Sequence, residues 1–155
     1  AKSNTGSRLM LYLEDLKIGD RFISREYEIT LDEIKQFASH YDPQPFHTDE
    51  ELAKEDPIFK GIAASGWHTS AITMRLWTEC MPIHGGLVGS ESSLRWPRPT
   101  RPGDRIHVEA EISAITPSKT KLDRGIVSYV TQALNQHGDV LLISTTKIVV
   151  FKKNV

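Results

Sequence analysis

Disulfide bonds within the chain are excluded, because Cys80 is the only cysteine among 155 residues. Small secreted domains depend on disulfides, whereas a single thiol fits a reducing compartment. The sequence also lacks any apolar run that approaches the roughly 18 residues needed to span a bilayer. We therefore expect no transmembrane helix and no membrane partner, with a cytoplasmic location as the default.

An excess of positive charge is missing as well. The 19 Lys and Arg residues nearly balance the 20 Asp and Glu residues, which gives a net charge of −1. Nucleic acids bind surfaces that are strongly basic, so no nucleic-acid partner is expected. The six histidines show no metal-binding spacing, and no glycine-rich phosphate loop is present. We expect neither a metal nor a separate cofactor.

The length and composition are those of one globular domain. A chain of 155 residues can bury most of its apolar surface without covalent support, and 39% of its residues are hydrophobic. No repeat or linker divides it. The segment from Ala1 to Ser7 lacks the hydrophobic region of a signal peptide. We expect residues 1–12 to form a mobile tail and residues 13–155 to form the domain.

The first third of the domain shows a short strand and two helix starts. Residues 27–29 are typical of a strand. Thr30 and Glu33 have the spacing of a capping box, and apolar residues follow at helical intervals, which predicts a helix over about 31–39. Thr48 and Glu51 repeat the capping-box spacing and predict another short helix through Ala53.

A central helix is predicted from about Gly66 to Cys80. Arg75 is the only fully charged side chain between Lys60 and Glu79, and the apolar residues cover several faces. A helix without a charged face is typically buried. In a domain of this size, other elements must therefore wrap around it.

The remainder of the chain is predicted to consist of strands. Apolar and polar residues alternate from Ile106 to Ser113, the pattern of a half-buried strand, and residues 86–96, 126–131 and 140–151 are also strand-like. Residues 135–139 form a turn signal. A helix followed by successive antiparallel strands predicts an α+β domain with the sheet curled around the helix, which is the hot-dog arrangement.

An acid–base pair is the main chemical feature of the sequence. Asp42 and His47 are five positions apart on a segment that contains Pro43 and Pro45. The prolines disfavour a regular helix there and favour a turn that brings the two side chains together. Imidazole titrates near neutral pH, so His47 is the candidate general base and Asp42 the group that orients water and delivers a proton.

A candidate oxyanion site lies where the central helix begins. The first N–H groups of a helix have no intrahelical acceptor, and the helix dipole favours negative charge there. The N–H of Gly66 or Trp67 can therefore hold a developing enolate oxygen. Glycine allows a ligand to approach the backbone closely, although it is also suited to a tight helix entry.

The sequence resembles the MaoC-like dehydratases, which include the (R)-specific enoyl-CoA hydratases. The resemblance runs from about Leu13 to Val150 and rests on Tyr41 to Asp49, Ala64 to Thr69, and Leu94 to Asp104. One departure is Ser65, where hydratases of this family often have histidine before the glycine. The resemblance implies reversible hydration of a trans-2-enoyl-CoA to a 3-hydroxyacyl-CoA of (R) configuration, with coenzyme A as part of the substrate.

Two other functions remain open: a hot-dog thioesterase, and a non-catalytic module that binds acyl-CoA or an acyl-carrier protein. Glu79 is a poor candidate for the carboxylate that hydrolysis requires, and a binder has no need of both Asp42 and His47. Candidate substrate contacts lie near the acid–base pair, near the start of the central helix or in the proline-rich segment. Each could instead serve core packing or be solvated. They are Phe46, Ser65, Trp67, His68 and Arg98.

The expected assembly is a homodimer. One sheet around one helix leaves a long edge strand and an incompletely covered helix, which are both liabilities in a monomer. We expect two sheets joined edge to edge, with the possibility of a larger oligomer of dimers.

Overall fold

The computed structural model describes residues 9–153, so most of the predicted tail lies outside the described residues. Leu11, which the tail was predicted to include, is packed. Its N–H donates to the Pro82 carbonyl at 2.7 Å, and its own carbonyl accepts from the His84 N–H at 2.9 Å. The Tyr12 ring stacks on the His84 ring with centroids 4.4 Å apart. The packed chain therefore begins before residue 13.

A six-stranded antiparallel sheet forms the body of the molecule, in the order β1-β4-β5-β6-β3 with β2 paired to β4. The sequence predicted β2 and the last four strands but missed β1, because three residues are too few to show alternation. The strands are β1 (Arg21–Ile23), β2 (Tyr27–Glu28), β3 (Val88–Arg95), β4 (Arg105–Pro117), β5 (Arg124–Leu134) and β6 (Val140–Phe151).

The predicted alternation in β4 is confirmed. Ile106, Val108, Ala110 and Ile112 are buried, and their polar neighbours are not. A β-bulge between Ile112 and Ala114 then shifts the register, so the alternation ends where the sequence pattern ends. The predicted turn at 135–139 joins β5 to β6. This register places one apolar face of the sheet toward the helix.

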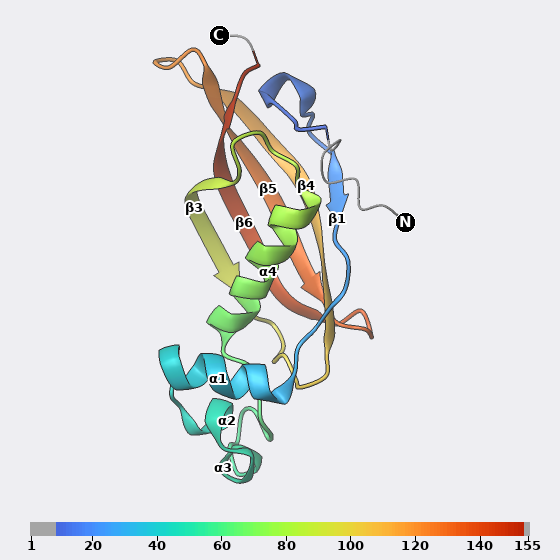
Figure 1. Ribbon diagram of the computed structural model, residues 1–155, viewed down its shortest axis with the longest axis vertical. Coiled ribbons are helices and arrows are strands. Elements are labelled where there is room, and N and C mark those ends of the chain that lie inside the picture. The colour runs from blue at the N-terminus through green and yellow to red at the C-terminus, as the bar shows by residue number, and fades with distance from the viewer. Residues whose placement is uncertain (1–8, 154–155) are drawn as a thin grey trace.

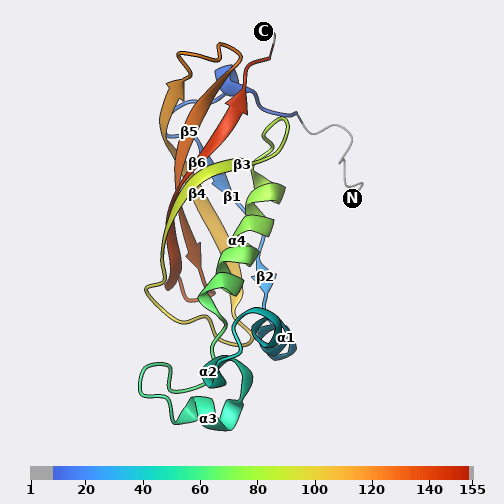
Figure 2. The same cartoon turned by 90° about the vertical axis from the view of Figure 1, so that its left-hand side faces the viewer.

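Helix α4 (Gly66–Cys80) lies against the concave face of the sheet, with the bounds that the sequence predicted (Figures 1 and 2). Ile72, Leu76 and Trp77 are buried against the sheet, and burial of each large side chain contributes about 1.5–3 kcal/mol. The Trp77 Nε1–H donates to Thr131 Oγ1 of β5 at 3.0 Å. The molecule therefore has the α+β hot-dog fold.

Helix α4 is buried on the side that faces the sheet and exposed on the other, as the expectation of an incompletely covered helix in one protomer implies. Trp67, Ala71, Met74 and Thr78 recur at helical spacing and are exposed; the exposed fraction of Trp67 is 60%. The lack of charge therefore marks both the buried side of α4 and an exposed uncharged stripe that the described chain leaves uncovered. We call these four residues the α4 stripe.

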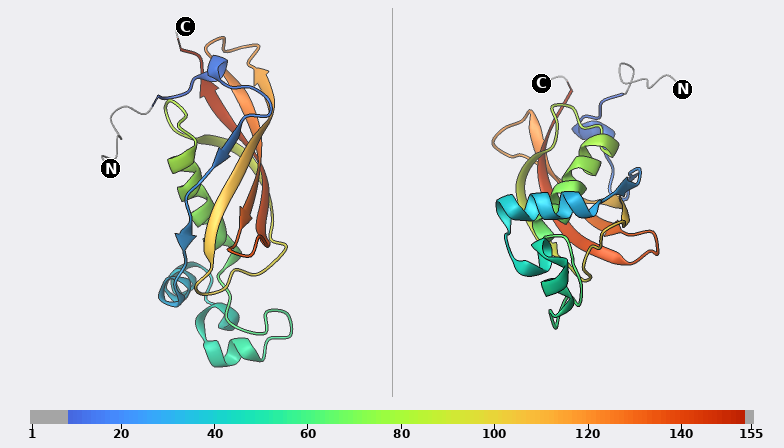
Figure 3. Two further views of the ribbon diagram at one scale, coloured as in Figure 1. Left: turned by 90° about the vertical axis from the view of Figure 1, so that its right-hand side faces the viewer. Right: turned by 60° about the horizontal axis from the view of Figure 1, so that its bottom comes forward.

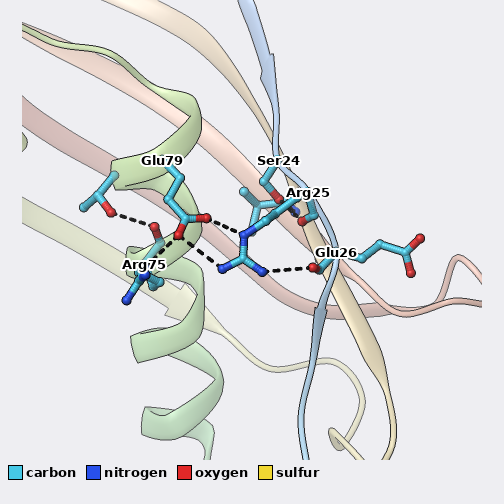
Figure 4. A network of polar contacts seen from close by, with 7 residues as sticks. Ser24, Arg25, Glu26, Arg75 and Glu79 are labelled. Atoms are coloured by element: carbon cyan, nitrogen blue, oxygen red, sulfur yellow. Dashed lines mark hydrogen bonds and ion pairs between the residues drawn. The ribbon is translucent and has the colours of Figure 1, made fainter. Parts of the chain in front are cut away.

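An ion-pair network ties the second half of α4 to the link between β1 and β2 (Figure 4). Arg25 donates from Nε to Glu79 Oε1 at 2.7 Å and from Nη2 to Oε2 at 3.1 Å, and Arg75 Nε donates to Oε2 at 2.7 Å. The hydrogen bonds from Arg25 and then Arg75 lower the pKa of Glu79 to about 2. Arg75, the one fully charged side chain between Lys60 and Glu79, thus has an ion-pair partner within its own helix.

Three short helices lie beyond the N-terminal end of α4, outside the sheet (Figure 3). They are α1 (Leu31–Tyr41), α2 (Pro45–Thr48) and α3 (Glu50–Lys54), and a 3-10 turn, η1 (Leu13–Asp15), precedes β1. The predicted capping box of α1 is confirmed: the Glu33 N–H donates to Thr30 Oγ1 at 3.2 Å, and the Thr30 N–H donates to Glu33 Oε1 at 3.1 Å. No helix among residues 9–153 combines the length and apolarity needed to cross a bilayer.

Two local predictions in this region are wrong. The cap of α3 is Asp49, whose Oδ1 accepts from the N–H groups of Glu51 and Leu52, whereas the Thr48 hydroxyl donates back to the Gln44 carbonyl. The proline segment also forms a single helical turn, α2, instead of only a loop. Pro45 is its first residue, where a missing N–H costs nothing and the fixed φ suits a helix.

Candidate active site

A cavity of about 360 Å³ opens where α4 begins. Its walls come from the end of α1, from α2, from the loop before α4, from the first turn of α4 and from the segment after β3. No strand residue lines it. The lining residues are Asp42, His47, Ile58, Phe59, Ala64, Gly66, Trp67, Thr69, Trp96, Pro97, Arg98, Pro99 and Thr100.

Asp42 and His47 meet in the wall of this cavity. Asp42 ends α1, where its N–H donates to the Ala38 carbonyl, and His47 lies on α2. The distance between His47 Nε2 and Asp42 Oδ2 is 3.3 Å, and the exposed fraction of the His47 side chain is only 5%. The Gln44 amide donates to the other Asp42 oxygen, Oδ1. Gln44, which the sequence analysis did not single out, thus orients the carboxylate.

The buried nitrogen of His47 defines the state of the ring. His47 Nδ1 lies 2.6 Å from the Ala63 carbonyl oxygen. A carbonyl can only accept a hydrogen bond, so Nδ1 carries a proton. In the neutral ring Nε2 is then an acceptor, and it faces the acceptor oxygen of Asp42. Both atoms belong to residues of the cavity wall, where they can accept hydrogen bonds from one ligand molecule.

The start of α4 forms the next part of the cavity wall. Within residues 9–153, the N–H groups of Gly66 and Trp67 have no hydrogen-bond acceptor, as is usual for the first turn of a helix. The Trp96 ring lies over Gly66, and a Cβ placed there would be 2.9 Å from its Cε2 atom. Trp96 also contacts Trp67 edge to face, with centroids 5.3 Å apart. The close approach that requires glycine here is therefore made by an indole of the same chain.

Two threonines and a phenylalanine complete the inner wall. Thr69 Oγ1 and Thr100 Oγ1 are both buried and lie 2.9 Å apart, and the Ala64 N–H donates to the Thr100 carbonyl at 2.9 Å. The Phe59 ring contacts the His47 ring edge on, with centroids 5.6 Å apart. The sequence indicated no role in the site for Phe59, Thr69, Trp96 or Thr100, because contacts between segments so far apart leave no local pattern.

Only some of the predicted substrate contacts line the cavity. Trp67 and Arg98 line the cavity, and Arg98 Nη1 lies 3.3 Å from Asp139 Oδ1. Phe46 does not line it; its ring stacks behind Phe59 with centroids 4.8 Å apart. The Ser65 hydroxyl is buried without a hydrogen-bond partner among residues 9–153 and also lies outside the lining.

His68 lies away from this cavity. Its ring stacks on Phe37 of α1 with centroids 4.5 Å apart, and burial lowers its pKa below the usual value of 6.5. This packing matches the structural reading of His68 that the sequence also allowed. In the described part of the chain, no group of three His, Cys, Asp or Glu side chains is placed to hold a metal ion.

Most of the chain matches a known protein family. The model of the MaoC-like domain matches residues 16–133, which include both members of the acid–base pair and all of α4. The chain belongs to the MaoC-like family.

Relatives extend this assignment. The MaoC-like domain described here is 32% identical over 127 residues to the uncharacterized protein YdeM of Bacillus subtilis (strain 168), covering 80% of this chain and 87% of that protein. The crystal structure of a MaoC-like dehydratase from Rhodospirillum rubrum is 51% identical, with a TM-score of 0.91 over 94% of this chain and 99% of the other.

A more distant structure shares the fold. The (R)-hydratase from A. caviae involved in PHA biosynthesis is 21% identical, with a TM-score of 0.73 over 90% of this chain and 99% of that one. At this identity the match concerns the fold alone. The MaoC-like domain therefore has the hot-dog architecture found in hydratases, with an acid–base pair in its cavity wall.

Proposed function

We propose that this MaoC-like protein adds water reversibly to a trans-2-enoyl-CoA to give a 3-hydroxyacyl-CoA, with (R) configuration inferred from the family resemblance. The observation that supports this most directly is the 3.3 Å contact between His47 Nε2 and Asp42 Oδ2 in the wall of a cavity beside a helix N-terminus. Hydration requires a base for water, a proton for the α-carbon and stabilisation of the enolate oxygen. These three requirements correspond to groups around one cavity.

The proposed reaction begins with water held by Asp42 and His47. His47 Nε2 accepts a proton from the water, the oxygen of which adds to C3 of the enoyl group. The thioester carbonyl becomes an enolate, and its oxygen accepts hydrogen bonds from the Gly66 and Trp67 N–H groups. The pair then gives a proton to C2. One O–H bond of water breaks and one C–H bond forms, so the pair ends in its starting state.

Other parts of the cavity have proposed roles in substrate binding. The apolar rings of Trp67, Trp96 and Phe59 suit the apolar part of an acyl thioester. Arg98 is exposed at the cavity wall and has one carboxylate partner, so it is the proposed contact for a phosphate group of coenzyme A. No separate cofactor takes part in these steps.

The reaction can be tested with crotonyl-CoA. Hydration removes the absorbance of the conjugated thioester without releasing a thiol. Release of free thiol would instead identify a thioesterase. If a panel of enoyl-CoAs that differ in length and branching binds without either change, the protein is a binding module.

The catalytic pair can be tested by isosteric substitution. Asp42→Asn and His47→Gln should each lower kcat by about 10²-fold or more, because each removes a proton-transfer group, and the double variant should be little worse than either. His107→Gln is a matched control, since His107 Nε2 makes another contact of this type, with Glu109 Oε2 at 3.6 Å on β4. Retention of more than about a third of wild-type turnover by either site variant would remove that residue from the mechanism.

The proposed assembly is a homodimer joined at the α4 stripe and the free edge of β3. Two observations support it. The stripe is apolar or hydroxylic and exposed. Within residues 9–153, β3 pairs with β6 alone, and nearly all residues of β3 are exposed. A lone edge strand and an uncovered helix face are liabilities in a monomer.

Sedimentation of the wild type and two variants tests this assembly. Ala71→Arg puts a long charged side chain in the middle of the α4 stripe and should produce monomers. Leu122→Arg changes an exposed apolar residue in the turn between β4 and β5, and should leave the dimer intact. A stable wild-type monomer at micromolar concentration with full activity would contradict the proposal.

A further inference from the structure

The Arg101 side chain is directed at the backbone that holds His47. Its Nη1 donates to the Gly61 carbonyl at 3.0 Å and to the Ile62 carbonyl at 3.2 Å, and its Nη2 donates to the Phe59 carbonyl. Since both terminal nitrogens are bonded to backbone carbonyls, the Arg101 guanidinium is engaged within the protein and is not directed at a ligand phosphate.

The residues that Arg101 holds form a loop with an unusual backbone, residues 59–63, named here the 59–63 loop. Lys60 has φ of 54°, a left-handed conformation that costs a non-glycine residue roughly 1–2 kcal/mol, and Gly61 follows with φ of 154°. Among residues 9–153, no backbone N–H donates to the Phe59, Gly61 or Ile62 carbonyl. The planar guanidinium, with donors in fixed directions, satisfies all three.

The last residue of the 59–63 loop is the one that His47 depends on. The Ala63 carbonyl accepts the proton of His47 Nδ1 at 2.6 Å, and the Ala63 N–H donates to the Phe46 carbonyl at 3.1 Å. This carbonyl is the reason why Nδ1 carries the proton and why Nε2 is left to face Asp42. If the loop moved, the ring would lose the acceptor that fixes its tautomer.

We infer that Arg101 is a positioning residue for His47: by holding the 59–63 loop, it places the Ala63 carbonyl that keeps the imidazole proton on Nδ1 and leaves Nε2 free at the cavity. Arg101 acts through the loop and does not touch the ring. Its effect on turnover rests on the proposed hydratase function, whereas its effect on the tautomer does not.

The test uses Arg101→Gln and Arg101→Lys in the full chain labelled with ¹⁵N-histidine. In the wild type, the ¹⁵N signals of His47 should show a protonated Nδ1 and an unprotonated Nε2. These signals are assigned to His47 by their absence from the spectrum of His47→Gln. Arg101→Gln should give a mixture of tautomers. It should also lower kcat by about 10- to 100-fold with little change in KM, since small displacements of catalytic groups have effects of this size. The lysine of Arg101→Lys can donate to fewer carbonyls than arginine, so its tautomer ratio and kcat should lie between those of the wild type and Arg101→Gln.

Arg105→Gln is the matched control. Arg105 lies four residues further along and bonds the exposed Glu26 carboxylate, so its loss should leave the His47 signal and kcat unchanged. A folded Arg101→Gln with the wild-type His47 signal and kcat within about twofold overturns the inference. So does failure of both Arg101 variants to fold, since the residue would then serve the whole domain. A shifted tautomer in a protein without hydratase activity upholds the positioning role and removes the proposed reaction.

Discussion

Substitution of Gly66 by alanine separates two reasons for glycine at the start of α4. An added Cβ would lie 2.9 Å from Cε2 and 3.1 Å from Cδ2 of Trp96. Overpacking of this kind costs about 1–3 kcal/mol. Alanine's better helix propensity offsets up to about 1 kcal/mol of that cost. We expect a net loss of about 1–2 kcal/mol, which corresponds to a fall in Tm of roughly 2–8 °C for a domain of this size.

The clash predicts coupling between the two positions. In a Trp96→Leu background the ring is gone, so Gly66→Ala should cost little or nothing in stability. Thermal unfolding of the four proteins at one concentration gives the coupling energy, which we expect to be at least about 1 kcal/mol. Gly89→Ala is the control, because a Cβ at Gly89 would meet no atom of the described residues within 4 Å. Effects that add to within about 0.3 kcal/mol would refute the clash.

The same four proteins also report on the proposed oxyanion role. If the thioester must approach the Gly66 backbone, the double variant should be as stable as Trp96→Leu but should have a lower kcat. Loss of one good oxyanion donor costs about 3–4 kcal/mol of transition-state stabilisation, so partial obstruction should cost 10-fold or more. Equal kcat values for the double variant and Trp96→Leu would assign the glycine to packing against the indole alone.

Three further results are expected. The Glu79 carboxylate, with its pKa lowered to about 2, stabilises the fold above about pH 4.5 and loses this effect as the pH falls toward 2. The Tm of Glu79→Gln should therefore decline less between about pH 4.5 and 2 than the Tm of the wild type. Burial lowers the pKa of His68 below 6.5, so protonation of the unfolded chain destabilises the protein as the pH falls below 6.5, and His68→Gln should flatten that part of the Tm profile. Thr131→Val leaves the buried Trp77 N–H without an acceptor and should cost about 1–3 kcal/mol in urea unfolding, whereas an unchanged midpoint would contradict the role of that bond.

Elements with a strong local pattern were predictable from the sequence. The bounds of α4 were correct because its apolar run begins after Ser65-Gly66 and ends before Met81-Pro82. The burial of β4 followed from its alternation. The approach of Asp42 to His47 followed from the stiffness of the proline segment, although the turn itself is helical because Pro45 occupies the first position of α2.

Features that depend on distant contacts were not predictable. Arg95, Arg98 and Arg101 are alike in sequence, and only the fold brings the Arg101 guanidinium to carbonyls about 40 residues away. The Trp96 ring over Gly66 is likewise a contact between separate segments. The sequence indicated that α4 would be incompletely covered but not which of its residues would be exposed, because the same uncharged residues suit a protein core and an interface.

Because no strand residue lines the cavity, the lining can change in sequence independently of the sheet. All lining positions fall in two stretches of chain, 42–69 and 96–100, which connect or cap the sheet without belonging to it. Substitutions there leave the ladder of hydrogen bonds between β4, β5 and β6 intact, so new ligand preferences can accumulate while the scaffold keeps its stability. A mutagenesis library restricted to the lining positions Ile58, Trp67, Pro97, Arg98 and Pro99, which are exposed, should therefore contain a higher fraction of folded variants than a library of equal size spread over the strands.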